Sequence, residues 1–150
     1  MHTLRLRPLT TTILLLLMLA TLVSACDSGI DNAHEGMELY PLDKMPAEVQ
    51  AAPVTVQQAY QFAAANPEAL TEIPCYCGCG AMGHTSNYAC YVSGQEADGS
   101  VIFDTHALGC SICVDITLDT MRMMKEGKSI PQIKSFVDET YAKYGPSNMP

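Results

Sequence analysis

The sequence lacks most of the features by which enzymes are identified. It has no P-loop, no dinucleotide-binding fingerprint and no Ser-His-Asp set, and no pair of carboxylates is spaced for acid–base chemistry. We therefore expect no enzymatic activity. Basic residues are also scarce, since 8 Lys and Arg stand against 16 Asp and Glu. A chain this acidic repels phosphates, so nucleic acid is not an expected partner.

Long apolar runs are missing as well. The longest, residues 13–23, is too short for a helix to cross a bilayer of about 30 Å. Two arginines precede it and two small residues follow it, a pattern that predicts a secretory signal peptide over residues 1–25. The junction at residues 23–26 resembles the bacterial lipobox, in which the cysteine thiol receives a diacylglyceryl group. We therefore expect Cys26 to carry an acyl lipid that anchors the protein on the extracytoplasmic face of the bacterial cell membrane.

The next segment, residues 26–53, is acidic, contains three prolines and shows no sustained hydrophobic period. This composition predicts a flexible tether between the membrane and a folded domain at residues 54–150.

Capping signals in that domain predict three helices. Thr55 opens the first with a capping box, and Pro67 limits it. The second runs from about residue 110 to a C-cap at Gly127. Ser129 caps the third, which ends before the Gly-Pro pair at residues 145–146.

Between the first two helices lies a long irregular segment, residues 73–109. Strand-like stretches at 88–92 and 100–103 favour a short hairpin within it. The predicted fold class is therefore mainly α: a small helical domain with a cysteine-rich irregular segment and a possible short β-hairpin. With no tryptophan and only 3 phenylalanines the core is thin, and small thin cores gain stability from disulfides or bound metal.

Cysteine and histidine supply the strongest chemical signal. Apart from Cys26 and the isolated Cys90, the cysteines fall in two clusters, and each cluster adjoins a histidine. The candidate ligands are Cys75, Cys77, Cys79, His84, Cys90, His106, Cys110 and Cys113. Their number suits two four-coordinate sites or one binuclear cluster, and their chemistry suits zinc or copper(I).

The spacing of the first cluster limits what it can do. In an extended strand, the Cα atoms of neighbouring cysteines in the run Cys75, Cys77, Cys79 would lie about 6.7 Å apart. This distance is at the outer edge of what a disulfide spans. The glycines between them permit a bend. Either all three thiolates converge on one ion, or they divide between two neighbouring ions.

The second cluster places Cys110 and Cys113 on one side of a helix start, where the positive helix end is expected to lower thiol pKa. Three readings stay open for the six cysteines. They could form three disulfides, which persist in exported proteins; Cys110 and Cys113 could form a thiol–disulfide redox pair; or the set could bind metal. The two histidines favour metal, because a disulfide scaffold does not need them.

Several motifs together are similar to those of the PCYCGC-motif lipoproteins of bacteria. They are residues 74–80 (PCYCGCG), 83–84 (GH), Cys90, His106, 109–115 (GCSICVD) and 144–146 (YGP). The resemblance covers about residues 60–150 plus the lipobox, and the first motif is highly specific. It implies an exported, lipid-anchored, cysteine-rich domain but no established reaction. The ending at residues 147–150 departs from the family's threonine- and proline-rich ending, and we expect no chemical consequence from this.

These observations predict a membrane-anchored lipoprotein that captures, buffers or delivers copper(I) or zinc. Its expected partners are the membrane, through the lipid, the metal ion and a metal-handling protein.

Overall fold

The computed structural model describes residues 37–150. The predicted signal peptide and the predicted lipidation at Cys26 lie outside the described residues. Among the residues described, no helix is long and apolar enough to cross a membrane.

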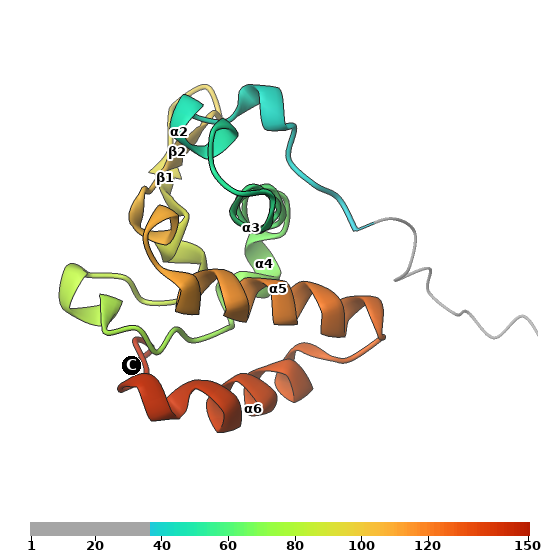
Figure 1. The fold of residues 1–150 in the computed structure, drawn as a ribbon, viewed down its shortest axis with the longest axis vertical. Coiled ribbons are helices and arrows are strands. Elements are labelled where there is room, and N and C mark those ends of the chain that lie inside the picture. Colours follow the sequence, from blue (N-terminus) through green and yellow to red (C-terminus); the bar gives the residue numbers. More distant parts are fainter. Residues whose placement is uncertain (1–36) are drawn as a thin grey trace, which may run out of the picture. The chain divides into compact units, whose positions relative to one another are not determined.

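Three helices form the frame of the domain. They are α3 (Val54–Ala65), α5 (Ser111–Lys125) and α6 (Ile130–Tyr141). In Figure 1, α5 and α6 run side by side while α3 is seen end-on across α5. Helix α5 thus contacts both of the others, and this places its first turn close to the cysteine-rich segment.

The ends of these helices follow mainly from local sequence. Gly127 adopts a left-handed φ of 77°, and the Lys128 N–H donates to the Met123 carbonyl at 3.0 Å, which closes α5. Ser129 and Gln132 form the capping box of α6. The capping box predicted at Thr55 is wrong. Helix α3 begins at Val54, so Pro53 and not Thr55 occupies the N-cap position, and Pro53 forms no side-chain cap.

The tether differs from the prediction over its last part. A 3-10 helix, Leu42–Lys44, and helix α2 (Ala47–Gln50) precede α3, and the Tyr40 N–H donates to Gln61 of α3 at 2.9 Å. Met45 and Val49 are only 4% and 2% exposed and belong to the core. Two isolated apolar side chains are too few to produce a hydrophobic period, so the sequence pattern did not indicate their burial.

A two-stranded antiparallel sheet confirms the hairpin, although its first strand is shifted. It consists of β1 (Val92–Gln95) and β2 (Val101–Phe103). Much of the predicted first strand is instead a 3-10 helix, Tyr88–Cys90, which directs Cys90 into the protein. Together with the short helix α4 (Pro67–Leu70), these elements confirm a mainly α fold with a small hairpin.

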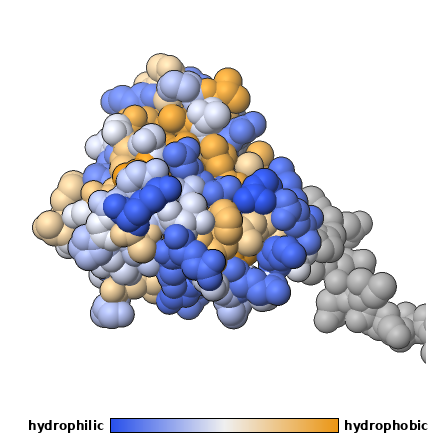
Figure 2. Space-filling view, turned by 60° about the horizontal axis from the view of Figure 1, so that its bottom comes forward, coloured by the Kyte–Doolittle hydropathy of each residue, from blue (hydrophilic) through white to orange (hydrophobic). Residues whose placement is uncertain are grey.

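The core is built around aromatic side chains despite their small number. The rings of Tyr60 and Tyr91 meet edge to face with centroids 4.9 Å apart. Ile116 of α5 and Ile133 of α6 are fully buried beside this core. Figure 2 shows the side that carries α6 turned forward, where hydrophilic residues dominate and hydrophobic ones form smaller patches. The cysteine-rich segment lies beside the C-terminal residues and the start of α5 (Figure 1).

Candidate metal centre

All eight predicted ligands belong to one set of neighbouring side chains. They come from three places: the run at residues 75–79, the turns at 84–90, and the segment at 106–113. Four groups have ligand atoms that all lie within 4.8 Å of one another. They are Cys77/His106/Cys110/Cys113, Cys79/His84/Cys90/His106, Cys75/Cys77/Cys79 and Cys75/Cys90/Cys113.

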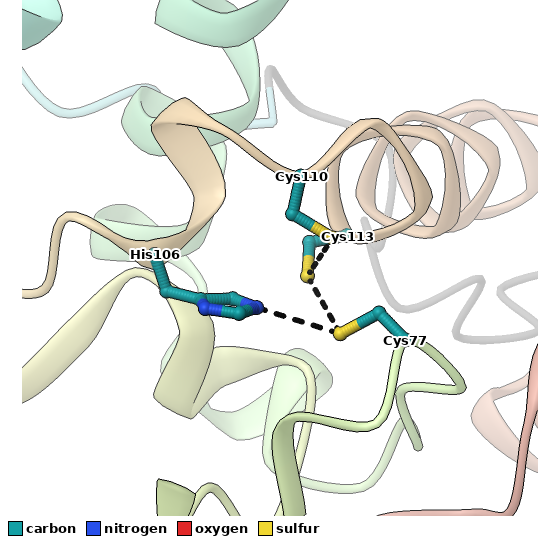
Figure 3. Close-up of side chains that lie close together, drawn as sticks. All are labelled: Cys77, His106, Cys110 and Cys113. Carbon is teal, nitrogen blue, oxygen red and sulfur yellow. Dashed lines mark hydrogen bonds between the residues drawn. The ribbon is translucent and has the colours of Figure 1, made fainter.

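The first group, which we call the outer group, is Cys77, His106, Cys110 and Cys113. Its side chains point toward one another from a loop, a 3-10 helix and the start of α5 (Figure 3). The Cys77 Sγ lies 3.4 Å from the His106 Nε2 and 3.5 Å from the Cys113 Sγ. The Cys113 Sγ is 3.1 Å from the Cys110 Sγ. Three of the four residues are only half-buried, so solvent reaches this group.

The inner group is Cys79, His84 and Cys90, to which His106 also lies close. The Cys79 and Cys90 sulfurs are 3.6 Å apart, and all three residues are buried. The His84 and His106 rings meet edge to face at 5.0 Å. The two groups are therefore adjacent.

Cys75 lies between the groups. Its side chain is fully buried, and its sulfur is 3.4 Å from that of Cys77 and 3.5 Å from that of Cys113. It is also within 4.8 Å of the sulfurs of Cys79 and Cys90.

The glycines of the motif allow this convergence. Gly78 has a φ of 85° and Gly83 a φ of 91°, both in the left-handed region that other residues rarely adopt. Between them the chain forms a 3-10 helix, Cys79–Met82. The sulfurs of Cys75, Cys77 and Cys79 come within 4.8 Å of one another, yet Cys77 and Cys79 also belong to different four-residue groups. The run is therefore bent, and its geometry allows either one shared ion or two neighbouring ions.

The six cysteines at positions 75–113 are free thiols, and no disulfide occurs in the described part of the chain. Their closest sulfur separations, 3.1 to 3.6 Å, exceed the S–S bond length of about 2.05 Å. They approach the separation of about 3.8 Å between two sulfurs on one tetrahedral zinc ion. The disulfide scaffold that the sequence left open is thus not what the structure shows.

Hydrogen bonding among the thiols makes their pKa values differ. The neighbouring thiols of Cys113 and Cys90 lower the pKa of Cys75 by donating to its sulfur. The contact between Cys75 and Cys113 in turn raises the pKa of Cys113. The lower pKa that the helix start predicted for Cys113 is therefore not found. Burial raises the pKa of Cys77 and Cys79. A metal ion that takes thiolates from this cluster must therefore displace protons.

His84 has one nitrogen without a partner. Its side chain is buried, and its Nδ1 atom has no hydrogen-bond partner among the residues the structure describes. Buried polar atoms are rarely left unpaired. Its Nε2 lies 3.5 Å from a carboxylate oxygen of Asp104. A histidine that binds metal through one nitrogen and faces a carboxylate with the other is a common arrangement.

The sequence comparison agrees with this picture of a cysteine-rich domain. A family described as "protein of unknown function with PCYCGC motif" has a model that matches residues 15–150. The chain belongs to this PCYCGC family. No curated protein and no solved structure matches it. The predicted resemblance is confirmed.

Two residues of this PCYCGC protein help to position the cluster and were missed from the sequence. Asp104 accepts the His106 backbone N–H at 2.7 Å through its second carboxylate oxygen, besides facing His84. An aspartate two residues before a candidate ligand is a local signal that could have revealed it.

Asn148 is the other, and no local signal marks it. It accepts the Cys75 N–H at 2.7 Å and donates its own N–H to the Cys75 carbonyl at 3.0 Å. Its side-chain amide also donates to the Cys79 sulfur at 3.4 Å. The ending of the PCYCGC protein, where no chemical role was expected, thus contacts the cysteine run directly.

Proposed function

We propose that this PCYCGC protein binds a transition metal ion, copper(I) or zinc, and captures, buffers or delivers it without catalysing a reaction. The observation that carries the proposal is the convergence of six free thiols and two imidazoles on one small region. Thiolate and imidazole are the ligands that zinc and copper(I) prefer in proteins.

Burial supports a bound cation. Polar and ionisable groups are costly to bury unless they are paired. Cys75, Cys79 and Cys90 are buried together with His84, whose Nδ1 lacks a partner. A metal ion would pair with these atoms simultaneously.

Access supports exchange of that ion. Cys110 lines a pocket of about 360 Å³ together with residues of α3 and α5 such as Val56 and Leu118. The half-buried Cys110 therefore borders space in which a ligand or a donor side chain can approach the cluster.

The cellular setting is part of the proposal. The signal-like residues 1–25 and the lipobox cysteine Cys26 support a lipoprotein anchored on the outer face of the bacterial cell membrane. A metal-handling protein of the same compartment would be its partner.

Metal content and thiol counting test the proposal. The full chain is purified in detergent without oxygen, its metal is measured by mass spectrometry, and its thiols are counted after denaturation with a chelator. We expect bound copper or zinc and six reactive thiols from positions 75–113. Cys90→Ser should lower the metal content, whereas Met82→Leu, at a 63% exposed residue next to the cluster, should not. Absence of both metal and free thiols would refute metal binding.

The alternative is thiol–disulfide exchange by Cys110 and Cys113, whose sulfurs are 3.1 Å apart with Cys110 half-exposed. It predicts insulin reduction that survives Cys77→Ser and disappears in Cys110→Ser. Metal binding predicts no such activity in either variant.

A further inference from the structure

Six of the eight ligands divide evenly between the two groups, and two are shared. Cys77, Cys110 and Cys113 belong to the outer group and not to the inner one, while Cys79, His84 and Cys90 belong to the inner group and not to the outer one. The two remaining residues are shared, because His106 lies close to both groups and Cys75 approaches sulfurs of both.

One four-coordinate ion does not account for this arrangement. Zinc in closed protein sites takes four ligands, which leaves four of the eight without a role. Each group has three ligands of its own and needs one more to reach four. The two shared residues supply that number: either His106 completes the outer group and Cys75 the inner one, or the reverse.

We infer that the cluster holds two metal ions side by side, one in the outer group and one in the inner group, with Cys75 and His106 between them. This inference rests on the proposed function and adds the number of ions and their separate ligands. The outer ion lies where three ligands are half-buried, and the inner ion where its own three ligands are buried. The outer ion should therefore exchange faster.

Zinc is the probe for the test. The reduced, metal-free full chain is titrated with zinc in detergent without oxygen, and bound zinc per chain is measured after gel filtration. We expect two zinc ions per chain, of which a soluble chelator removes one much faster than the other. X-ray absorption at the zinc edge should show scattering from a second zinc ion.

Paired variants assign the sites. Cys110→Ser should lower the ratio to one and remove the rapidly exchanging ion. Cys90→Ser should also lower it to one but leave the rapidly exchanging ion. Met82→Leu should keep both ions. Circular dichroism of each variant shows whether the fold is retained.

The wild-type ratio decides the inference even if a variant fails to fold. A ratio of one or above two overturns the two-ion arrangement while metal binding stands. A ratio of zero overturns the proposed function as well. A ratio of two in which folded Cys110→Ser loses both ions would show one joint site and also overturn it.

Discussion

Replacing Asp104 by asparagine tests how His84 is oriented. The carboxylate lies 3.5 Å from the His84 Nε2 and accepts the His106 N–H at 2.7 Å through its other oxygen. An asparagine in the same position keeps an acceptor for the His106 N–H. However, it presents an amide N–H group to the His84 Nε2, which favours the tautomer with the proton on Nδ1. That proton would occupy the buried nitrogen that has no hydrogen-bond partner.

The expected loss of metal affinity is that of one ligand, His84, which is no longer held in its orientation. Replacing a residue that orients a metal ligand lowers metal affinity by about 10- to 100-fold, which corresponds to about 1.4 to 2.7 kcal/mol. Only the inner ion should be affected, because His84 is a ligand of that group alone. Competition of the full chain with a chromophoric chelator gives the affinity.

The matched control is Asp98→Asn in the hairpin turn, where an exposed carboxylate accepts the Ser100 N–H at 2.9 Å. It should leave zinc affinity unchanged. The double variant His84→Ala with Asp104→Asn should bind no more weakly than His84→Ala alone, because the two residues act through the same ligand. Wild-type affinity in Asp104→Asn, or a full additional loss in the double variant, would refute binding through Nδ1.

Three further perturbations test how the cluster is held. Gly145→Ala would place a Cβ 2.9 Å from the Tyr76 carbonyl oxygen and should lower stability by about 1–3 kcal/mol in urea unfolding, unlike Gly109→Ala, where no atom lies within 4 Å. Asn148→Ala should lower stability by about 1–3 kcal/mol and also lower zinc affinity, because it leaves the Cys75 N–H and the Ser86 carbonyl without their side-chain partner. An unchanged melting temperature would contradict this. Burial and the nearby Asp138 raise the pKa of Tyr76 to about 12 from its usual 10, so the folded state keeps this proton longer than the unfolded chain does. Stability should therefore fall as the pH rises from 10 to 12, and less steeply in Tyr76→Phe.

Local sequence determined much of the secondary structure of this protein. The C-cap at Gly127 and the capping box at Ser129 act within a few residues, so their patterns located the end of α5 and the start of α6. The residue types of the cluster were also predictable, because thiols and imidazoles identify a site chemically before the fold is known.

The tertiary structure alone decided how those residues meet. Cys113 is 38 residues beyond Cys75, yet the two sulfurs are 3.5 Å apart. Asn148 is 73 residues beyond Cys75, yet its side-chain oxygen lies 2.7 Å from the Cys75 backbone nitrogen. No short pattern encodes contacts that depend on how α5 packs against α3 and α6. The same holds for Val49, which is buried only because α2 packs on α3. The sequence determined which ligands this protein has, and long-range packing decided that they converge as free thiols.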